Sequence, residues 1–174
     1  MGTVNGNIVL REATAADVSM LVTLVHSAFA EYRGRLDPPS GAEKEDEATL
    51  ARALAHGGAG VACVDGAMIG CVFYHRDRDA GPLTLRPARL EFVYFGRLSV
   101  APAFRRRGIA EALTGYVEQR AREMGVRRVQ LGVRLALPHL QSYYERLGYR
   151  VIRRESHRGY TQPTSAVMEK TLDP

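Results

Sequence analysis

The segment between residues 90 and 125 limits the fold of this chain more than any other. Residues 90–100 are rich in Phe, Val and Tyr, a composition typical of a β-strand. A turn with three consecutive arginines follows, and the apolar spacing over residues 108–124 predicts an amphipathic helix that Gly125 ends. A strand, a short basic turn and a helix in this order indicate a mixed α/β protein.

The rest of the chain also alternates between predicted strands and predicted helices. Asp65-Gly66 lies between two apolar segments and predicts a β-hairpin, while Gly96 is a candidate bulge in the long strand. No position divides the pattern convincingly, so we expect one domain over residues 1–174. The other predicted strands are 7–11, 61–64, 68–74, 126–133, 149–154 and 166–172, the other predicted helices are 14–32, 43–56 and 138–147, and 75–87 is a predicted connection.

Composition and charge exclude several classes of protein. No apolar segment approaches the ~20 residues that span a bilayer, and no leader is visible, so we expect a cytoplasmic protein without a membrane partner. Cys63 and Cys71 have no metal-ligand spacing, and we expect no metal. The net charge of +5 suits an anionic partner. Because the arginines cluster tightly only in the turn, an anion pocket is favoured over a nucleic-acid surface.

The turn over residues 101–110 has the chemistry of a phosphate site. The first N–H groups of a helix lack internal partners and carry partial positive charge, so they attract anions. Gly108 allows close approach of the backbone, Ala110 leaves room, and three arginines add positive potential. A basic helix start without a specific ligand fits the same residues, and neither the P-loop nor the dinucleotide glycine pattern is present.

Two motifs in order resemble the GNAT superfamily of acetyl-CoA-dependent N-acetyltransferases. Residues 105–110 (Arg-Arg-Arg-Gly-Ile-Ala) resemble its pyrophosphate signature, and residues 143–149 (Tyr-Tyr-Glu-Arg-Leu-Gly-Tyr) resemble a second motif downstream. The resemblance is close from residue 89 onward and covers the first half only in the order of elements. It implies an α/β (α+β) GNAT fold: a mixed, mostly antiparallel, twisted sheet of about six or seven strands, flanked by about four helices and splayed near Val100 and Val129.

By this resemblance the strand and the turn would bind acetyl-CoA as a co-substrate. The strand would pair with the pantetheine arm, the turn would hold the phosphates, and Tyr144 would donate a hydrogen bond to the departing thiolate. The implied cofactor-binding residues are Leu98, Ser99, Val100, Arg105, Arg106, Arg107, Gly108, Ile109, Ala110, Glu111 and Tyr144.

The attacking amine requires a base, because an alkyl ammonium near pKa 10.4 loses its proton at pH 7 at a cost of ~4.6 kcal/mol. Glu91 is the best-placed acid as a catalytic residue, although a solvated strand glutamate fits equally well. Two positions depart from the family. Leu137 stands where many relatives carry an asparagine that contacts the cofactor, and Gly132 stands where some carry a glutamate base.

The resemblance also places the loop of residues 32–40 over the acceptor pocket. Tyr32 and Asp37 in this loop, with His157 and Tyr160 on the other side, are therefore candidate substrate-binding residues. His157 is also a candidate for the base, because histidine is the side-chain type that titrates near neutral pH, although an ordinary surface-loop histidine fits the sequence as well.

We expect direct acetyl transfer from acetyl-CoA to a primary amine of a small molecule, in a ternary complex without a covalent intermediate. The chain has no Gly-x-Ser-x-Gly, and neither cysteine has a histidine partner by spacing. A protein or peptide amine is the alternative acceptor. A non-catalytic acyl-CoA-binding regulatory module is a further alternative, suggested by Gly132 and Leu137. Homodimers are frequent in the family, which leaves a homodimer open.

Overall fold

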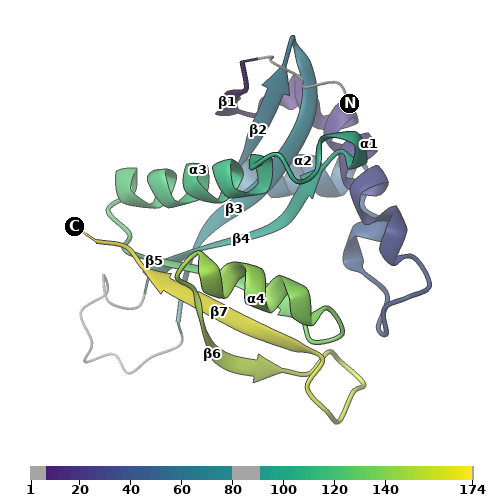
Figure 1. Ribbon diagram of the computed structural model, residues 1–174, viewed down its shortest axis with the longest axis vertical. Coiled ribbons are helices and arrows are strands. Elements are labelled where there is room, and N and C mark those ends of the chain that lie inside the picture. The colour runs from purple at the N-terminus through teal and green to yellow at the C-terminus, as the bar shows by residue number, and fades with distance from the viewer. Residues whose placement is uncertain (1–6, 80–90, 174) are drawn as a thin grey trace.

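The chain forms one open sheet whose two halves meet at a single parallel pair of strands. In the computed structural model, which describes residues 7–79 and 91–173, the order of the seven strands is β1-β2-β3-β4-β5-β7-β6, and only β4 and β5 are parallel (Figure 1). These ranges also contain four α-helices, so the expected mixed, mostly antiparallel sheet with its helices is confirmed. The strands are β1 (Val9–Glu12), β2 (Gly58–Val64), β3 (Ala67–Arg78), β4 (Glu91–Val100), β5 (Arg128–Arg134), β6 (Arg150–Glu155) and β7 (Ser165–Thr171); the helices are α1 (Val18–Phe29), α2 (Glu47–His56), α3 (Ile109–Glu123) and α4 (Pro138–Arg146).

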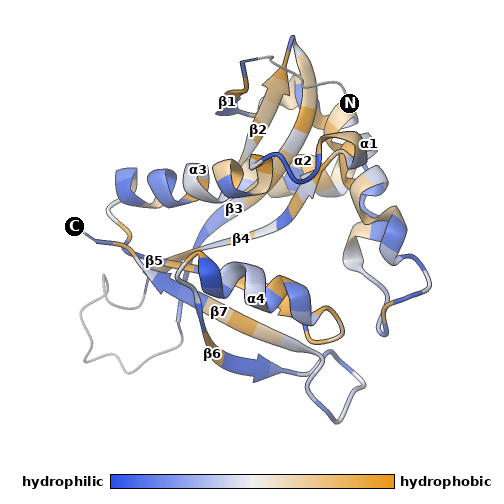
Figure 2. Ribbon diagram, in the orientation of Figure 1, coloured by the Kyte–Doolittle hydropathy of each residue, from blue (hydrophilic) through white to orange (hydrophobic). Residues whose placement is uncertain are grey.

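Helices cover both faces of the sheet. Successive side chains of a strand point to opposite faces, and in β3 Val72 belongs to the hydrophobic cluster of α3 and α4, whereas Phe73 belongs to that of α1 and α2. Apolar residues of α1 lie in the second cluster, where Leu21 and Val25 are fully buried. Hydrophobic residues follow β2 and β3 between the helices, whereas the last part of β6, at the sheet edge, is hydrophilic (Figure 2).

Several boundaries differ from those predicted. α2 begins at Glu47 rather than residue 43, because the Asp46 carboxylate accepts a hydrogen bond from the Thr49 N–H at 2.7 Å and caps the helix. β3 continues to Arg78, so the start of the predicted connection over residues 75–87 is strand. The rest of that connection after residue 79, together with residue 90 of the predicted long strand, lies outside the described residues.

β4 and β5 separate half-way along their length. Residues 93–95 pair with residues 129–131, and beyond them the β5-facing edge of β4 has no neighbouring strand within the described part of the chain. The pairing of β4 with β3 shifts just after Gly96, and Arg97 has φ +50°, so the bulge follows Gly96 instead of lying on it. The sheet was expected to splay near Val100 and Val129; Val100 lies in the separated part of β4, whereas Val129 is still paired, so the strands separate just after Leu131.

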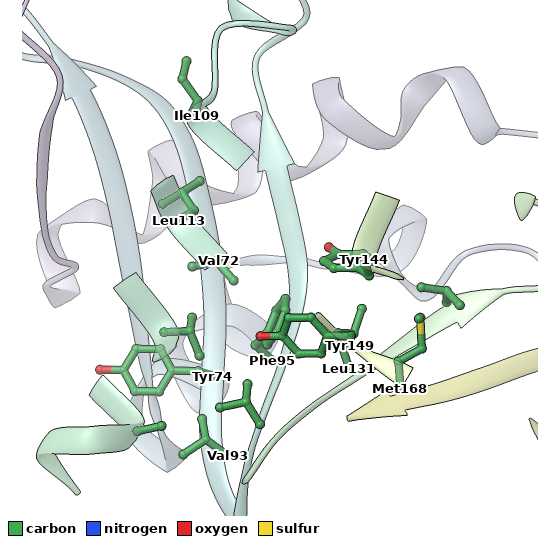
Figure 3. Packing of buried hydrophobic residues seen from close by; sticks show 14 of the residues in the cluster. Val72, Tyr74, Val93, Phe95, Ile109, Leu113, Leu131, Tyr144, Tyr149 and Met168 are labelled. Carbon is green, nitrogen blue, oxygen red and sulfur yellow. The ribbon is translucent and has the colours of Figure 1, made fainter. Parts of the chain in front are cut away.

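Aromatic rings fill the base of the splay. Phe95, Tyr144 and Tyr149 meet edge to face, with ring centroids 5.8–6.1 Å apart (Figure 3). The Tyr149 hydroxyl donates a hydrogen bond to Glu118 at 3.0 Å, and Lys170 donates to the same carboxylate at 2.9 Å. This network ties α3 to β7 below the point where β4 and β5 diverge.

Asp17, which immediately precedes α1, generates a prediction on stability. Its carboxylate pairs with Arg11 at 2.8 Å and accepts the Thr14 N–H at 2.7 Å. The hydrogen bond from Arg11 holds the pKa of Asp17 well below its usual range, so the ionised form stabilises the folded state above the pKa of an unfolded aspartate and loses this effect as pH falls through the lower folded pKa. We expect Asp17→Asn to lower the free energy of unfolding at pH 7 by about 1–2 kcal/mol in urea denaturation.

The same measurement over pH checks the sign. The difference between the parent and Asp17→Asn should shrink progressively below pH ~4, because the parent then loses the stabilisation that the variant already lacks. A difference that stays constant down to pH ~2 would contradict this assignment.

Candidate active site

A cavity of about 540 Å³ borders the predicted phosphate turn. It lies between the unpaired half of β4, the start of α3 and the end of α1, and polar backbone faces it from the turn. Its lining comprises Ala28, Phe29, Glu31, Tyr32, Leu98, Val100, Phe104, Arg105, Arg106, Gly108, Ile109, Ala110, Glu111, His139 and Tyr143.

The backbone of the turn is arranged to expose the N-terminus of α3. Gly108 precedes the helix with φ +78°, and a Cβ on it would meet no atom within 4 Å, so this position opens to the cavity. Arg106 also has a positive φ, +59°, which is uncommon for a residue with a side chain and is often retained at functional sites. The N–H groups of residues 109–111 lie in the first turn and have no acceptor within the helix.

The Arg105 side chain is held by contacts within the protein. Its guanidinium pairs with Glu31 at 2.6 Å and donates hydrogen bonds to the carbonyl oxygens of Ala28 at 2.8 Å and Val100 at 3.4 Å. The side chain therefore fastens the end of α1 to the end of β4. Although Arg105 borders the cavity as predicted, its charge is already paired, which argues against a direct role in phosphate binding.

The other two arginines of the turn differ from Arg105. Arg106 is exposed and borders the cavity, so its guanidinium can reach a bound anion. Arg107 is exposed too, but its guanidinium lies over the Phe104 ring at 5.4 Å and the residue is outside the cavity lining. Of the three predicted arginines, Arg106 is the one that the structure leaves best placed for phosphate.

The remaining predicted cofactor residues divide between cavity and core. Leu98, Val100, Ala110 and Glu111 border the cavity, and Ile109 borders it while being 2% exposed. Ser99 points away from both cavities: it is 1% exposed, and its hydroxyl donates to the Arg97 carbonyl at 3.0 Å.

A second cavity, of about 530 Å³, adjoins the first and lies between β4 and β5, where the two strands diverge. It runs past Tyr144 on α4 to Arg134 at the end of β5 and His157 in the loop before β7. Leu137, at the family's asparagine position, also borders it. The residues that border both cavities are Phe29, Tyr32, Leu98, Ala110 and Tyr143.

Tyr144 lies where the two halves of the sheet diverge. Its side chain borders the second cavity, its ring stands edge to face against Phe95, and the residue is 7% exposed (Figure 3). Burial raises the pKa of Tyr144 well above its ordinary value, so the phenol keeps its proton at neutral pH. A protonated phenol at this point can donate a hydrogen bond into the cavity.

Tyr94 is a cavity residue that the sequence analysis missed. A Cβ on Gly132 would lie 2.8 Å from the Tyr94 hydroxyl oxygen, so the phenol occupies the space that a side chain at position 132 would need. Burial raises the pKa of Tyr94 above its ordinary value. The signal in the sequence was Gly132, which stands where some relatives carry a glutamate. In the structure the Tyr94 phenol fills the space that a side chain at position 132 would occupy.

The structure does not bring Glu91 to either cavity. Its carboxylate pairs with Arg76 at 2.5 Å and Arg78 at 3.4 Å. The hydrogen bond from Arg76 lowers the pKa of Glu91 below its usual value, which weakens it as a base. Glu91 also precedes the point of divergence at Phe95 by roughly 13 Å of strand. These positions argue against Glu91 as the catalytic base.

The four predicted substrate-binding residues separate into two groups. Tyr32 borders both cavities and His157 borders the second, with its Nδ1 2.5 Å from the Thr164 hydroxyl. Asp37 and Tyr160 are hydrogen-bonded to each other, with the phenol as donor, and neither is among the residues that line the two cavities. Their contact joins the loop after α1 to the loop between β6 and β7.

Both signature motifs lie within the part of the chain that matches a known family. The sequence model of the acetyltransferase (GNAT) family matches residues 22–149. The chain belongs to the acetyltransferase (GNAT) family. No match was found among curated protein sequences.

Solved structures of GNAT proteins share the fold at low sequence identity. The PaiA N-acetyltransferase of Thermoplasma acidophilum, solved with coenzyme A, is 18% identical with a TM-score of 0.71, covering 95% of this chain and 99% of that one. The ribosomal-protein-S18-alanine N-acetyltransferase of Escherichia coli is 16% identical with a TM-score of 0.71, covering 97% and 96%. Naa50 of Arabidopsis thaliana, solved with a bisubstrate analogue, is 15% identical with a TM-score of 0.70, covering 95% and 99%.

Two further features concern the described ranges, residues 7–79 and 91–173. None of their helices has the length and apolar character required to cross a membrane. No three side chains of His, Cys, Asp or Glu gather there as a metal ion would require.

The contact between Gly132 and Tyr94 generates a prediction that a double variant tests. We expect Gly132→Ala to destabilise the protein by about 1 kcal/mol, because the added methyl group overlaps the Tyr94 hydroxyl and the half-buried ring must shift. In a Tyr94→Phe background, which lacks that oxygen, the same substitution should have little effect. Denaturant unfolding of the four proteins gives the coupling energy, and additive effects would contradict the shared volume.

Proposed function

We propose that this GNAT protein transfers the acetyl group of acetyl-CoA to a primary amine of a small molecule, by direct attack in a ternary complex. The observation that carries the proposal is that the second cavity lies between the diverging strands β4 and β5 and shares five lining residues with the first. The first cavity reaches the N-terminus of α3, which attracts anions. The second reaches the last residue of β5 and the loop between β6 and β7. Two adjoining cavities of this kind allow two substrates to meet between the strands.

The residues around the first cavity fit coenzyme A. The open edge of β4 over residues 96–100 offers backbone N–H and C=O groups to an extended amide-containing arm, as another strand would. Leu98, Val100 and Ala110 would contact the arm, and the amides of residues 108–111 with Arg106 would hold the phosphates. Bound there, acetyl-CoA supplies an acetyl group activated as a thioester.

Tyr144 is the proposed hydrogen-bond donor to the departing thiolate. As the new N–C bond forms and the C–S bond breaks, negative charge develops on sulfur, and a neutral phenol can stabilise it by a hydrogen bond. Because burial raises the pKa of Tyr144, full proton transfer is less favourable than hydrogen-bond donation. The role requires only that the phenol remain protonated.

His157 is the proposed acceptor of the amine proton. Among the residues that the structure describes, His157 is the histidine that borders the second cavity. An imidazole can accept a proton from the amine directly or through a water molecule. The contact of Nδ1 with Thr164 orients the ring and leaves Nε2 for this exchange. This assignment replaces the one based on Glu91, whose carboxylate is held by two arginines on the other side of the paired segment.

Joined loops support a small acceptor. The Tyr160 hydroxyl donates to Asp37, and Arg134 Nη2 donates to the Pro38 carbonyl at 2.6 Å, so the loop after α1 is tied to the β6–β7 loop and to β5. These contacts hold the two loops together, which favours a small acceptor over an extended peptide lying between them. The ribosomal-protein and peptide acetyltransferases among the similar structures make a protein amine the alternative acceptor, which an acceptor screen would reveal.

Acetyl-CoA binding tests the cofactor assignment. We expect micromolar affinity by calorimetry in the parent and loss of binding in Ala110→Glu, because a carboxylate there repels the phosphates and fills space shared by both cavities. A glutamate in the first turn suits a helix N-terminus, so the fold should persist. Ala103→Glu is the matched control, since this exposed residue adds the same charge to the same turn outside the cavity. Equal affinity in the two variants would count against the site.

Tyr144→Phe tests the donor. We expect kcat to fall by about 10- to 100-fold in steady-state acetyl transfer, because the developing thiolate loses its hydrogen-bond donor. The KM for acetyl-CoA should change little, since the ring and its contact with Phe95 remain. An unchanged kcat, with chemistry shown to be rate-limiting, would remove Tyr144 from the mechanism.

A further inference from the structure

The charges around the second cavity are of one sign. Its charged or chargeable lining groups, apart from tyrosines, are Arg97, Arg134 and His157, and no described residue that lines it carries a carboxylate. Arg97 is compensated from outside the lining by an ion pair with the buried Glu45. Arg134 therefore dominates the charge of the acceptor side.

The protein leaves Arg134 largely unsatisfied. Its guanidinium donates to one neutral acceptor, the Pro38 carbonyl, and its buried Nε has no hydrogen-bond partner. Arg134 forms no direct ion pair with a described carboxylate: Asp37, the acid on the facing loop, accepts its hydrogen bond from Tyr160 and acts on the guanidinium only at longer range. Burial lowers the pKa of Arg134 in spite of this attraction, because desolvation of the guanidinium is not offset by a direct pair.

We propose that the acceptor is an amino carboxylate whose carboxylate group binds the Arg134 guanidinium. This inference rests on the acetyltransferase function proposed above and names its substrate class. A planar guanidinium matches a carboxylate in shape and charge, and such a pair is stronger than hydrogen bonds between neutral groups. The carboxylate provides the direct ion pair that no described carboxylate of the protein forms with Arg134.

The position of Arg134 suits a small molecule with both groups. Arg134 follows Gly132 by two residues on β5, about 7 Å along a strand, and both border the same cavity beyond the point where β4 and β5 separate. A carboxylate held at Arg134 thus leaves the amine of the same molecule close to the gap that leads to the first cavity. Phe29, Leu36 and Tyr94 in the lining suit an apolar side chain.

Other amines fit these charges poorly. A polyamine or other polycation finds no carboxylate in the described lining and meets the positive charge of Arg134. A neutral monoamine leaves the guanidinium unpaired. Discrimination by charge at Arg134 therefore favours amino acids over their amides and over the amines formed by decarboxylation.

Matched acceptors test this inference on the full chain. Release of coenzyme A thiol would be followed at saturating acetyl-CoA with leucine, methionine, phenylalanine, β-alanine and γ-aminobutyrate, each beside its amide. We expect Arg134→Gln to lower kcat/KM for an amino acid that the parent acetylates by about 10- to 100-fold, mainly through KM, and to leave that for the amide unchanged. Taking the ratio of parent to variant for each acceptor cancels the different basicities of the amines.

Three control variants separate charge from loop structure. Arg134→Lys should recover part of the preference, because it keeps the charge but not the planar fork. Tyr160→Phe loosens the same loop contact without removing charge and should affect acid and amide alike. Arg153→Gln removes one positive charge from an arginine outside the cavity lining that is paired with Glu155, and should leave the preference intact.

The outcomes are distinguishable. Equal losses for acid and amide in Arg134→Gln, a parent that acetylates amides or plain amines but no amino acid, or a parent that binds acetyl-CoA and acetylates none of the acids would each overturn the inference. Absence of acetyl-CoA binding in calorimetry would instead remove the proposed function on which it rests.

Discussion

The loss of pairing between β4 and β5 is the constraint on which the rest of the structure depends. Residues 93–95 hold the two halves of the sheet together, and the bulge at Arg97 bends β4 away from β5 immediately afterwards. A strand edge left open inside a protein carries unpaired N–H and C=O groups, which need a partner of extended shape. The same divergence connects the space beside α3 with the space beside the loops, so one backbone feature creates both halves of the proposed site.

Aromatic packing keeps the two strands apart without leaving an empty core. The rings of Phe95, Tyr144 and Tyr149 fill the narrow end of the gap, while the contacts of Glu118 with Tyr149 and Lys170 fasten α3 to β7. Farther along the gap, the second cavity begins. Tyr144 lies between the packed core and the second cavity: its ring packs against Phe95, and the residue also borders the cavity.

Features that local sequence determines were predictable. The hairpin, the glycines at helix ends and the basic turn each depend on a few adjacent residues, and the two motifs were sufficient to indicate the family. Features that depend on neighbouring strands were not: the partners of Glu91 come from β3, and the exact site of the bulge depends on the register with β3. Tyr94 and Arg134 were missed for the same reason, since only the assembled sheet shows which strand residues face the gap.

Arg105 shows how one motif mixes two kinds of requirement. Its side chain is held by Glu31 and by carbonyl oxygens at Ala28 and Val100, whereas its neighbour Arg106 has solvent and the cavity around it. Replacing either Arg105 or Glu31 alone by a neutral residue would leave the other without its ion-pair partner between α1 and the turn. Among homologous sequences these two positions should therefore vary together during evolution, while Arg106 should vary only as far as its ligand permits. Correlated substitution would thus separate the part of the signature that serves folding from the part that serves recognition.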